Sequence, residues 1–300
     1  MSLSIWTGAL EQGLLWGPMI LGVYLTFRVL NFPDLTVDGA FTLGAAVSTR
    51  LILMDCDPWT ATLVAVLAGA LAGLMTGLIH TQLKIDPLLS GILSMIALYS
   101  VNLRVMGAAN LSLLRIDTVF TDVVSLVTRP YAALALGGAV CLVLIIILYR
   151  FLQTEVGLAV RATGDNPQMI RSLGVNTNHT KIIGLSLSNA LVAVSGSLVG
   201  QYQSFADVGM GIGMIVVGLA SVIIGEVLVR TPTLLRALLA ALVGSIVYRA
   251  VIALVLQLGM PPTDLKLLTA AIVTVALAFP IFRTRFRRLP PLPGRGSQSA

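Results

Sequence analysis

The sequence predicts an all-α, polytopic integral membrane protein, and three observations lead to this fold class. Hydrophobic residues make up 57% of the 300 residues and charged residues only 11%, whereas a soluble globular domain carries roughly 25% charged residues. The mean hydropathy is +0.95. Apolar stretches of about 20 residues, the length at which a helix crosses the hydrocarbon core, recur along the chain. A soluble protein of this composition would expose large apolar patches, so lipid is the expected solvent.

About nine membrane segments are expected from these stretches. They run Thr7–Leu30, Thr36–Met54, Thr60–Thr81, Pro87–Met106, Tyr131–Phe151, Lys181–Gln203, Gly209–Val229, Leu234–Leu258 and Leu265–Phe282. The second and seventh segments are rich in glycine, so we expect them to be broken or re-entrant. Such backbone is tolerated at membrane depth only where it is buried in protein or lines a cavity.

No polar stretch is long enough to form a separate soluble domain. Residues 1–282 are therefore expected to form a single transmembrane domain, which carries one long polar loop at 150–181. Residues 283–300 form a basic tail that is rich in proline and glycine. This composition predicts a disordered tail.

The distribution of lysine and arginine predicts an N-terminus outside the cell and a C-terminus in the cytoplasm. This orientation places most of the 19 basic residues on the inner side, namely Arg28, Lys84, Arg150, Arg161, Arg171, Lys181, Arg230, Arg236, Arg283, Arg285, Arg287, Arg288 and Arg295. The outer loops are comparatively acidic, with Asp55, Asp57, Asp117, Asp122 and Asp264. Because the basic residues flank apolar spans and form no patch, the net charge of +6 does not indicate a nucleic-acid partner.

Two weak similarities suggest an internal repeat. An aspartate followed by a glycine-rich apolar run occurs at Asp34 and again at Asp207, and the segment after Asp86 has a counterpart after Pro261. Both pairs are offset by about 175 residues, and the two halves would cross the membrane in opposite senses, which is typical of the inverted repeats of transporters. Chance similarity between apolar stretches is the alternative.

The residues give no sign of catalysis or of a metal site. The histidines His80 and His179 lie far apart at predicted helix ends, and Cys56 and Cys141 have no metal-binding or redox spacing. No Gly-Lys dipeptide occurs, so a phosphate-binding P-loop is absent from the sequence. We therefore expect no enzyme activity in this chain, and any ATP hydrolysis must be supplied by a partner.

The polar loop predicts a short amphipathic helix over Asp165–Gly174. Asn166 can cap its N-terminus, Pro167 suits the first helical position, and Gly174 is a good C-terminal stop. The apolar residues expected along one face are Met169, Ile170 and Leu173. Such a helix between two spans can dock a cytoplasmic partner. The alternative is an interfacial helix that rests on lipid.

Two runs of residues carry a resemblance to a known family. One comprises Gly157, Arg161, Ala162, Gly164, Asp165, Asn166, Leu173, Gly174, Val175, Lys181, Ser188, Ala193 and Gly196, and the other is Asn31–Gly39. Together they resemble bacterial ABC-importer permeases of the branched-chain amino acid and ribose type. In that family the loop carries the coupling helix that sits in a groove of the ATPase. Carried over to this chain, the coupling residues are Arg161, Asp165, Asn166, Pro167, Met169, Ile170, Arg171, Leu173 and Gly174.

This resemblance implies a multi-pass permease subunit of the bacterial inner membrane. Its partners would be a cytoplasmic ATP-binding-cassette ATPase, a periplasmic or lipid-anchored substrate-binding protein and a second permease chain, with a homodimer favoured. No cofactor is expected in this chain, because ATP and Mg²⁺ would bind the ATPase. The run Gly218–Glu226 looks like a subgroup that is paired with lipoprotein-type binding proteins and in part linked to aromatic amino acids. Amino acids are therefore favoured over sugars as the solute, although Glu226 departs from the better-known permeases.

Polar, acidic and methionine side chains near the predicted breaks are candidates for the solute path: Asp34, Thr36, Asp38, Gln201, Met210, Met214 and Glu226. Intramembrane acids are functional candidates by default. Each candidate also has a structural alternative. Asp34 can cap the second segment, Glu226 can pair with Arg230 four residues on, the methionines can pack between helices, and Gln201 can lie in an interfacial belt.

Two other classes of protein compete with the ABC permease. A stand-alone secondary transporter driven by an ion gradient would also show inverted repeats and buried acids, but it has no need for a docking helix in the 150–181 loop. A membrane enzyme is disfavoured because the sequence lacks a convergent set of His, Cys or Ser residues with a base.

Overall fold

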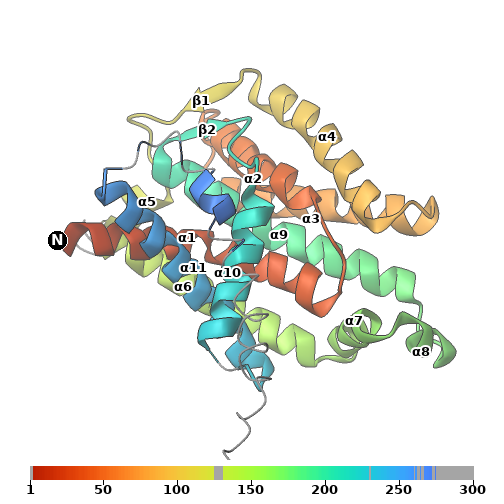
Figure 1. Cartoon of the computed structure of the whole chain (residues 1–300). Coiled ribbons are helices and arrows are strands. Elements are labelled where there is room, and N and C mark those ends of the chain that lie inside the picture. Colours follow the sequence, from red (N-terminus) through yellow and green to blue (C-terminus); the bar gives the residue numbers. More distant parts are fainter. Residues whose placement is uncertain are drawn as a thin grey trace, which may run out of the picture.

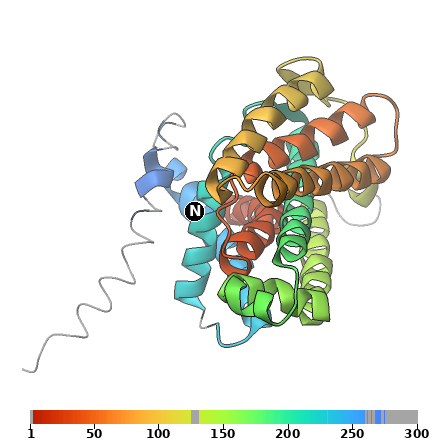
Figure 2. The same ribbon diagram turned by 90° about the vertical axis from the view of Figure 1, so that its right-hand side faces the viewer.

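The computed structural model describes residues 3–124, 131–229 and 231–259, together with 261, 264, 267–271 and 274. Its elements are α1 (Leu3–Tyr24), the π-helical turn η1 (Leu25–Val29), α2 (Thr36–Ile52), α3 (Pro58–Gln82), α4 (Pro87–Met106), β1 (Asn110–Ser112), α5 (Val119–Val124), α6 (Ala132–Gln153), α7 (Glu155–Asp165), α8 (Pro167–Ser172), α9 (Thr177–Gln203), β2 (Phe205–Asp207), α10 (Met214–Leu228) and α11 (Leu234–Gln257). Figure 1 and Figure 2, two views at right angles, show a bundle of helices, and Figure 1 also shows one small pair of strands.

Within the described residues, five helices are long and apolar enough to cross a membrane, and these are α3, α4, α6, α9 and α11. On α3, Leu63, Leu67 and Leu71 are 64%, 62% and 61% exposed. Residues four apart share one face of a helix, so α3 turns an apolar face outward, as a helix in contact with lipid does. The predicted class, an all-α polytopic membrane protein, is confirmed.

The helices α2 and α10 are too short to cross a bilayer. They contain 17 and 15 residues, and at about 1.5 Å per residue neither reaches the roughly 30 Å of the hydrocarbon core. They correspond to the two predicted segments that are rich in glycine. The predicted ninth segment, Leu265–Phe282, and the tail 283–300 lie largely outside the described residues, so nine crossings stay a prediction.

Side-chain caps start several of the long helices where the sequence places an acid before a proline. Asp57 accepts hydrogen bonds from the backbone N–H groups of Trp59 and Thr60, and Pro58 follows it at the first helical position. Asp86 does the same for α4. These caps satisfy donors that have no partner within the helix, so the sequence fixes where α3 and α4 begin.

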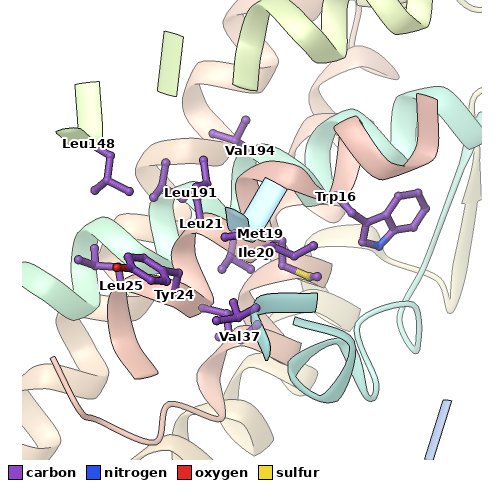
Figure 3. Close-up of a cluster of buried hydrophobic side chains, with 14 of the residues drawn as sticks. Trp16, Met19, Ile20, Leu21, Tyr24, Leu25, Val37, Leu148, Leu191 and Val194 are labelled. Carbon is purple, nitrogen blue, oxygen red and sulfur yellow. The ribbon is translucent and has the colours of Figure 1, made fainter. Parts of the chain in front are cut away.

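The core forms where α1 and α9 cross the centre of the bundle. Figure 3 shows Met19 and Leu21 of α1 close to Leu191 and Val194 of α9, with Leu148 of α6 nearby. Serines of α9 bond backbone carbonyls of α1, from Ser188 to Gly22 over 2.8 Å and from Ser195 to Leu15 over 2.7 Å. Interhelical hydrogen bonds and small residues of this kind hold membrane helices together, because lipid supplies no hydrophobic drive.

The bundle has two distinct ends. At one end α7 and α8 extend from the spans, and we call this the α7–α8 end (Figure 1). At the other end β1 and β2 pair antiparallel, with Leu111 opposite Ala206, and we call this the β1–β2 end. The N-terminal end of α1 lies away from α7 and α8. Helix α1 then runs to the α7–α8 end, because its continuation η1 packs against α7.

The same succession of elements occurs twice along the chain. A long helix, a break, a short helix and a long helix follow one another as α1, α2 and α3, and again as α9, α10 and α11. Each break contains an aspartate whose Oδ1 accepts from the backbone N–H two residues on: Thr36 to Asp34 over 2.9 Å, and Gly209 to Asp207 over 2.8 Å. Helix α1 packs against α10 and α11, while α9 packs against α2 and α3. This exchange of partners agrees with the predicted internal repeat.

Candidate functional site

The break before α2 is held by Asp34, which is fully buried. Its Oδ1 accepts from the backbone N–H of Thr36, and its Oδ2 accepts from Nδ2 of Asn189 in the middle of α9 over 2.8 Å. The hydroxyl of Thr36 lies 2.8 Å from that of Thr76 on α3, which in turn bonds Ser94 on α4 over 2.8 Å. These contacts place Asp34 and Thr36 as braces between four helices. The capping alternative for Asp34 agrees with this geometry.

Asp38, in the first turn of α2, joins the two short helices. Its Oδ2 accepts from the backbone N–H of Gly213 over 2.8 Å, and its Oδ1 accepts from that of Ile215 over 2.8 Å. Those N–H groups are among the unpaired donors at the start of α10. The carboxylate therefore lies at the N-termini of both α2 and α10, where the helix dipoles favour negative charge.

A hollow of about 410 Å³ opens beside this carboxylate. It lies between α2, α4 and the turn before α10, and we call it the Asp38 hollow. Its lining comprises Asp38, Gly39, Thr42, Met95, Ile96, Tyr99, Ser100, Asn102, Val208 and Ile212. Of the seven residues that the sequence suggests for a solute path, only Asp38 lines this hollow.

Two further candidates lie in other surroundings. Gln201 is buried near the β1–β2 end, where its Oε1 accepts from the backbone N–H of Val119 and its Nε2 donates to Thr62 over 2.9 Å. Its side chain therefore braces α9 against α3 and the start of α5. Glu226 forms an ion pair with Arg28 at the α7–α8 end. That partner is 198 residues away, whereas Arg230, the partner expected from helix spacing, lies outside the described residues.

The two methionines lie in and directly after the turn before α10. Met210 is within the turn and Met214 is the first residue of α10. Both are partly buried and pack against the central core. This position agrees with the packing alternative, and neither methionine lines the Asp38 hollow.

The polar loop folds into α7 and α8 with the predicted start and stop. The Asn166 side chain accepts from the backbone N–H of Met169 over 3.1 Å, and Pro167 is the first residue of α8. Gly174 has a φ of 86°. The N–H groups of Gly174 and Val175 bond the carbonyls of Arg171 and Ile170, which completes a Schellman motif. The capped short helix is therefore confirmed.

Two details of this loop differ from the expectation. Asp165, the expected first residue of the short helix, is instead the last residue of α7, and α8 starts only at Pro167 after a break at Asn166. Met169, Ile170 and Leu173 also share no exposed face: Met169 and Leu173 are 58% and 66% exposed, whereas Ile170 is 8% exposed. The packing of α7 and α9 turns Ile170 inward, so it cannot fill a groove on a partner in this conformation.

Specific contacts fasten α7 and α8 to the bundle. The hydroxyls of Thr163 on α7 and Thr180 on α9 lie 2.9 Å apart, and Nε of Arg171 donates to Thr177 over 2.6 Å. Gly164 lies so close to the carbonyl of Val29 that no side chain would fit there. These contacts tie α8 to the start of α9 and α7 to α9 and η1.

A basic cavity of about 540 Å³ adjoins α8 at the start of α9. Its lining includes His80, Lys84, Arg171 and Lys181 and contains no carboxylate. Nδ1 of His80 lies 2.7 Å from the carbonyl of Ile85, and Nε2 lies 2.9 Å from Nζ of Lys181. The carbonyl can only accept and the ammonium can only donate, so His80 is neutral. Sequence reasoning missed this cluster, because His80 and Lys181 are 101 residues apart.

The geometry separates two candidate functional regions within the described chain. One is the exposed surface of α8 with the basic cavity, which suits docking of a partner. The other is the pair of broken helices around Asp38, where a polar group and a hollow meet in the bundle. Helix α9 links them, since it carries both Thr177 beside α8 and Asn189 beside Asp34.

Comparisons with known proteins agree with this arrangement. Residues 7–278 match the family model described as "Branched-chain amino acid transport system / permease component". A tyrosine transport system permease protein of Clostridioides difficile is 44% identical over 90% of this chain and 89% of its own length. A probable branched-chain amino acid transport permease protein, LivH, of Methanocaldococcus jannaschii is 25% identical over 69% of each chain. The ribose import permease protein RbsC of Escherichia coli K12 is 24% identical over 69% of this chain and 64% of its own.

No solved structure matches the chain. The family model covers nearly all of the transmembrane region, and its relatives are permease components of ABC-type importers. The chain therefore belongs to the family of branched-chain amino acid transport system permease components, which are transporter subunits and not themselves catalytic.

Proposed function

We propose that this chain forms half of the membrane pathway of an ABC importer for an amino acid with an aromatic side chain. The relative that is 44% identical is named for tyrosine, and the two chains cover each other almost entirely. A second copy of the chain would complete the pathway. The observation that carries the proposal is α8, a capped helix that presents Met169 and Leu173 to solvent outside the bundle.

In this proposal the α7–α8 end faces the cytoplasm and binds the ATPase. Basic residues gather at this end, among them Lys84, Arg171 and Lys181 of the basic cavity, and basic loops stay on the cytoplasmic side. The exposed leucine and methionine of α8 would enter a groove of the ATPase, while the basic residues would orient the contact through charge. The β1–β2 end would then receive the solute from a binding protein outside the inner membrane.

The contacts along α9 supply a mechanical route for coupling. A displacement of α8 reaches α9 through Arg171 and Thr177. Twelve residues on, Asn189 holds Asp34 in the break before α2, and Asp38 ties that break to the start of α10. Broken helices are the elements that move around a fixed site in many transporters. ATP binding at the partner would thereby change the arrangement of α2 and α10.

The test is co-purification of the ATPase with the permease after the change Leu173→Asp. A truncated or charged anchor in a small interface costs about 2 kcal/mol or more, a roughly thirtyfold loss of affinity, so the ATPase should be lost. Leu114→Asp is the matched control, because Leu114 is 74% exposed at the β1–β2 end. If Leu173→Asp retains the ATPase and normal uptake, α8 is not the coupling element.

A secondary transporter is separated from this proposal by its energy source. In proteoliposomes that contain permease, ATPase and binding protein, uptake of tyrosine should require ATP and persist when an ionophore collapses ion gradients. Uptake by the permease alone that follows an ion gradient would instead support the secondary transporter.

A further inference from the structure

We infer that the Asp38 hollow binds the amino group of the transported solute, with the carboxylate of Asp38 as its counter-ion and the side chains of Tyr99 and Ile212 against the apolar part of the solute. The inference rests on the proposed function, because it takes the solute to be an amino acid. It adds the site, its orientation and the chemical group that is recognised.

The charge of the site suits a primary ammonium group. A carboxylate has about four acceptor positions, and the backbone donors of Gly213 and Ile215 use one on each oxygen of Asp38. Among the described residues, the ion pair that forms joins Arg28 and Glu226. Asp38 therefore has no basic side chain as its partner within that part of the chain. An acid inside a membrane protein that lacks such a partner is a place where a cationic group of a ligand gains favourable binding energy.

The shape of the hollow suits a single amino acid. Its volume of about 410 Å³ falls within the range of roughly 300–1,000 Å³ that is usual for small-molecule sites. Ile96, Tyr99 and Ile212 are exposed in its lining and supply apolar surface to it. Asn102 holds α4, which carries Ile96 and Tyr99, against α2, since its Nδ2 donates to the carbonyl of Gly39 over 3.1 Å.

The carboxylate of the amino acid also finds possible donors. Tyr99 and Ser100 are consecutive residues of α4, and both carry a hydroxyl and are exposed in the lining of the hollow. Hydroxyl groups donate well to a carboxylate. A neutral sugar could use these hydroxyls but would leave Asp38 without a counter-charge. The hollow is therefore selective for amines over polyols.

The experiment measures protection of a cysteine in the hollow. Ser100→Cys in the purified permease–ATPase complex is alkylated with a maleimide in the presence of L-tyrosine, tyramine, 3-(4-hydroxyphenyl)propionate or ribose, and labelling is quantified by peptide mass spectrometry. Cys56 is exposed at the β1–β2 end and serves as the internal control. L-tyrosine and tyramine should slow labelling of residue 100 and leave Cys56 unchanged. The propionate and ribose should have no effect.

A second variant tests the counter-ion. Asp38→Asn keeps one oxygen to accept from the start of α10, but it removes the charge. Half-protection should then need an L-tyrosine concentration higher by about tenfold or more, the effect of losing a hydrogen bond between charged groups. If Asp38→Asn does not assemble, the comparison of tyramine with the propionate on the otherwise unchanged chain still decides the question.

The outcomes separate this inference from the proposed function. ATP-driven uptake of tyrosine without protection of residue 100, or protection by the propionate as strong as by tyramine, overturns the inference and leaves the importer in place. Protection by tyramine with no dependence of uptake on the ATPase overturns the importer and leaves the site in place. If residue 100 is labelled equally slowly with and without solute, because lipid fills the hollow, the inference is also overturned.

Discussion

The carboxylate of Asp38 accepts a hydrogen bond from the backbone N–H of Ile215 over 2.8 Å, across 177 residues of sequence. One side chain thereby fixes the start of α10 to the start of α2. Both helices are too short to cross the bilayer, so each needs a partner for its unpaired N-terminal donors inside the protein. Asp38 supplies that partner for α10.

The first prediction concerns this cap. Asp38→Ala removes both acceptors and leaves the partly buried N–H groups of Gly213 and Ile215 without this partner, which should cost about 1–3 kcal/mol of stability. Asp38→Asn keeps one acceptor and should cost less. The order of stability of the unchanged chain, Asp38→Asn and Asp38→Ala is measured by thermal unfolding of the purified proteins in detergent, monitored by light scattering and fluorescence. Equal midpoints for Asp38→Ala and the unchanged chain would show that the cap contributes nothing.

The second prediction concerns the ion pair of Arg28 and Glu226. Their side chains are 50% and 24% exposed, and such pairs contribute only about 0.2–1 kcal/mol. Arg28→Ala and Glu226→Gln should therefore lower stability slightly, and the double variant should lower it by less than the sum of the two. A double-mutant cycle at low and at high salt measures this coupling. A coupling that does not fall with salt would contradict a solvent-screened pair.

The third prediction concerns the stop of α8. Gly174 adopts a φ of 86°, a left-handed conformation in which an added Cβ costs about 1–2 kcal/mol. Gly174→Ala should therefore loosen the Schellman motif and weaken binding of the ATPase, whereas Gly174→Asn should be milder because asparagine tolerates this conformation. Binding of the purified ATPase to the permease in nanodiscs provides the measurement. If Gly174→Ala binds as well as the unchanged chain, the ordered end of α8 is not needed for docking.

Local signals in the sequence predict the helix boundaries well. Asp57 with Pro58, Asp86 with Pro87, and Gly174 act on their neighbours through backbone hydrogen bonds, so their effect is visible in a short stretch of sequence. The glycine-rich composition of two segments likewise predicts that they are broken, and the helices found there, α2 and α10, are short.

Contacts between distant helices could not be predicted in this way. The sequence offers Arg230 as the neighbour of Glu226, but the packing of α10 beside the end of α1 brings Arg28 to it. Ile170 lies on the predicted apolar face of α8, but the fold of α7 over the start of α9 buries it. The partnership of Asp34 with Asn189 likewise depends on how α9 passes the break before α2. Such pairs follow from tertiary packing, which the local pattern of a single sequence does not reveal.

The last prediction concerns orientation, and a native residue makes it testable with little change to the chain. Cys56 is free and exposed, and it lies in the short connection between α2 and α3 at the β1–β2 end, whereas Cys141 is buried. The basic residues gather at the opposite end, around α8 and the start of α9. Because basic loops stay in the cytoplasm, the β1–β2 end should face outward.

A membrane-impermeant maleimide added to intact cells should therefore label Cys56. Gln168→Cys places a thiol on the exposed surface of α8 and should be labelled only after the membrane is permeabilised. Labelling of residue 168 in intact cells, with Cys56 protected, would reverse the orientation. The ATPase would then have no access to α8, so this result would also contradict the proposed docking surface.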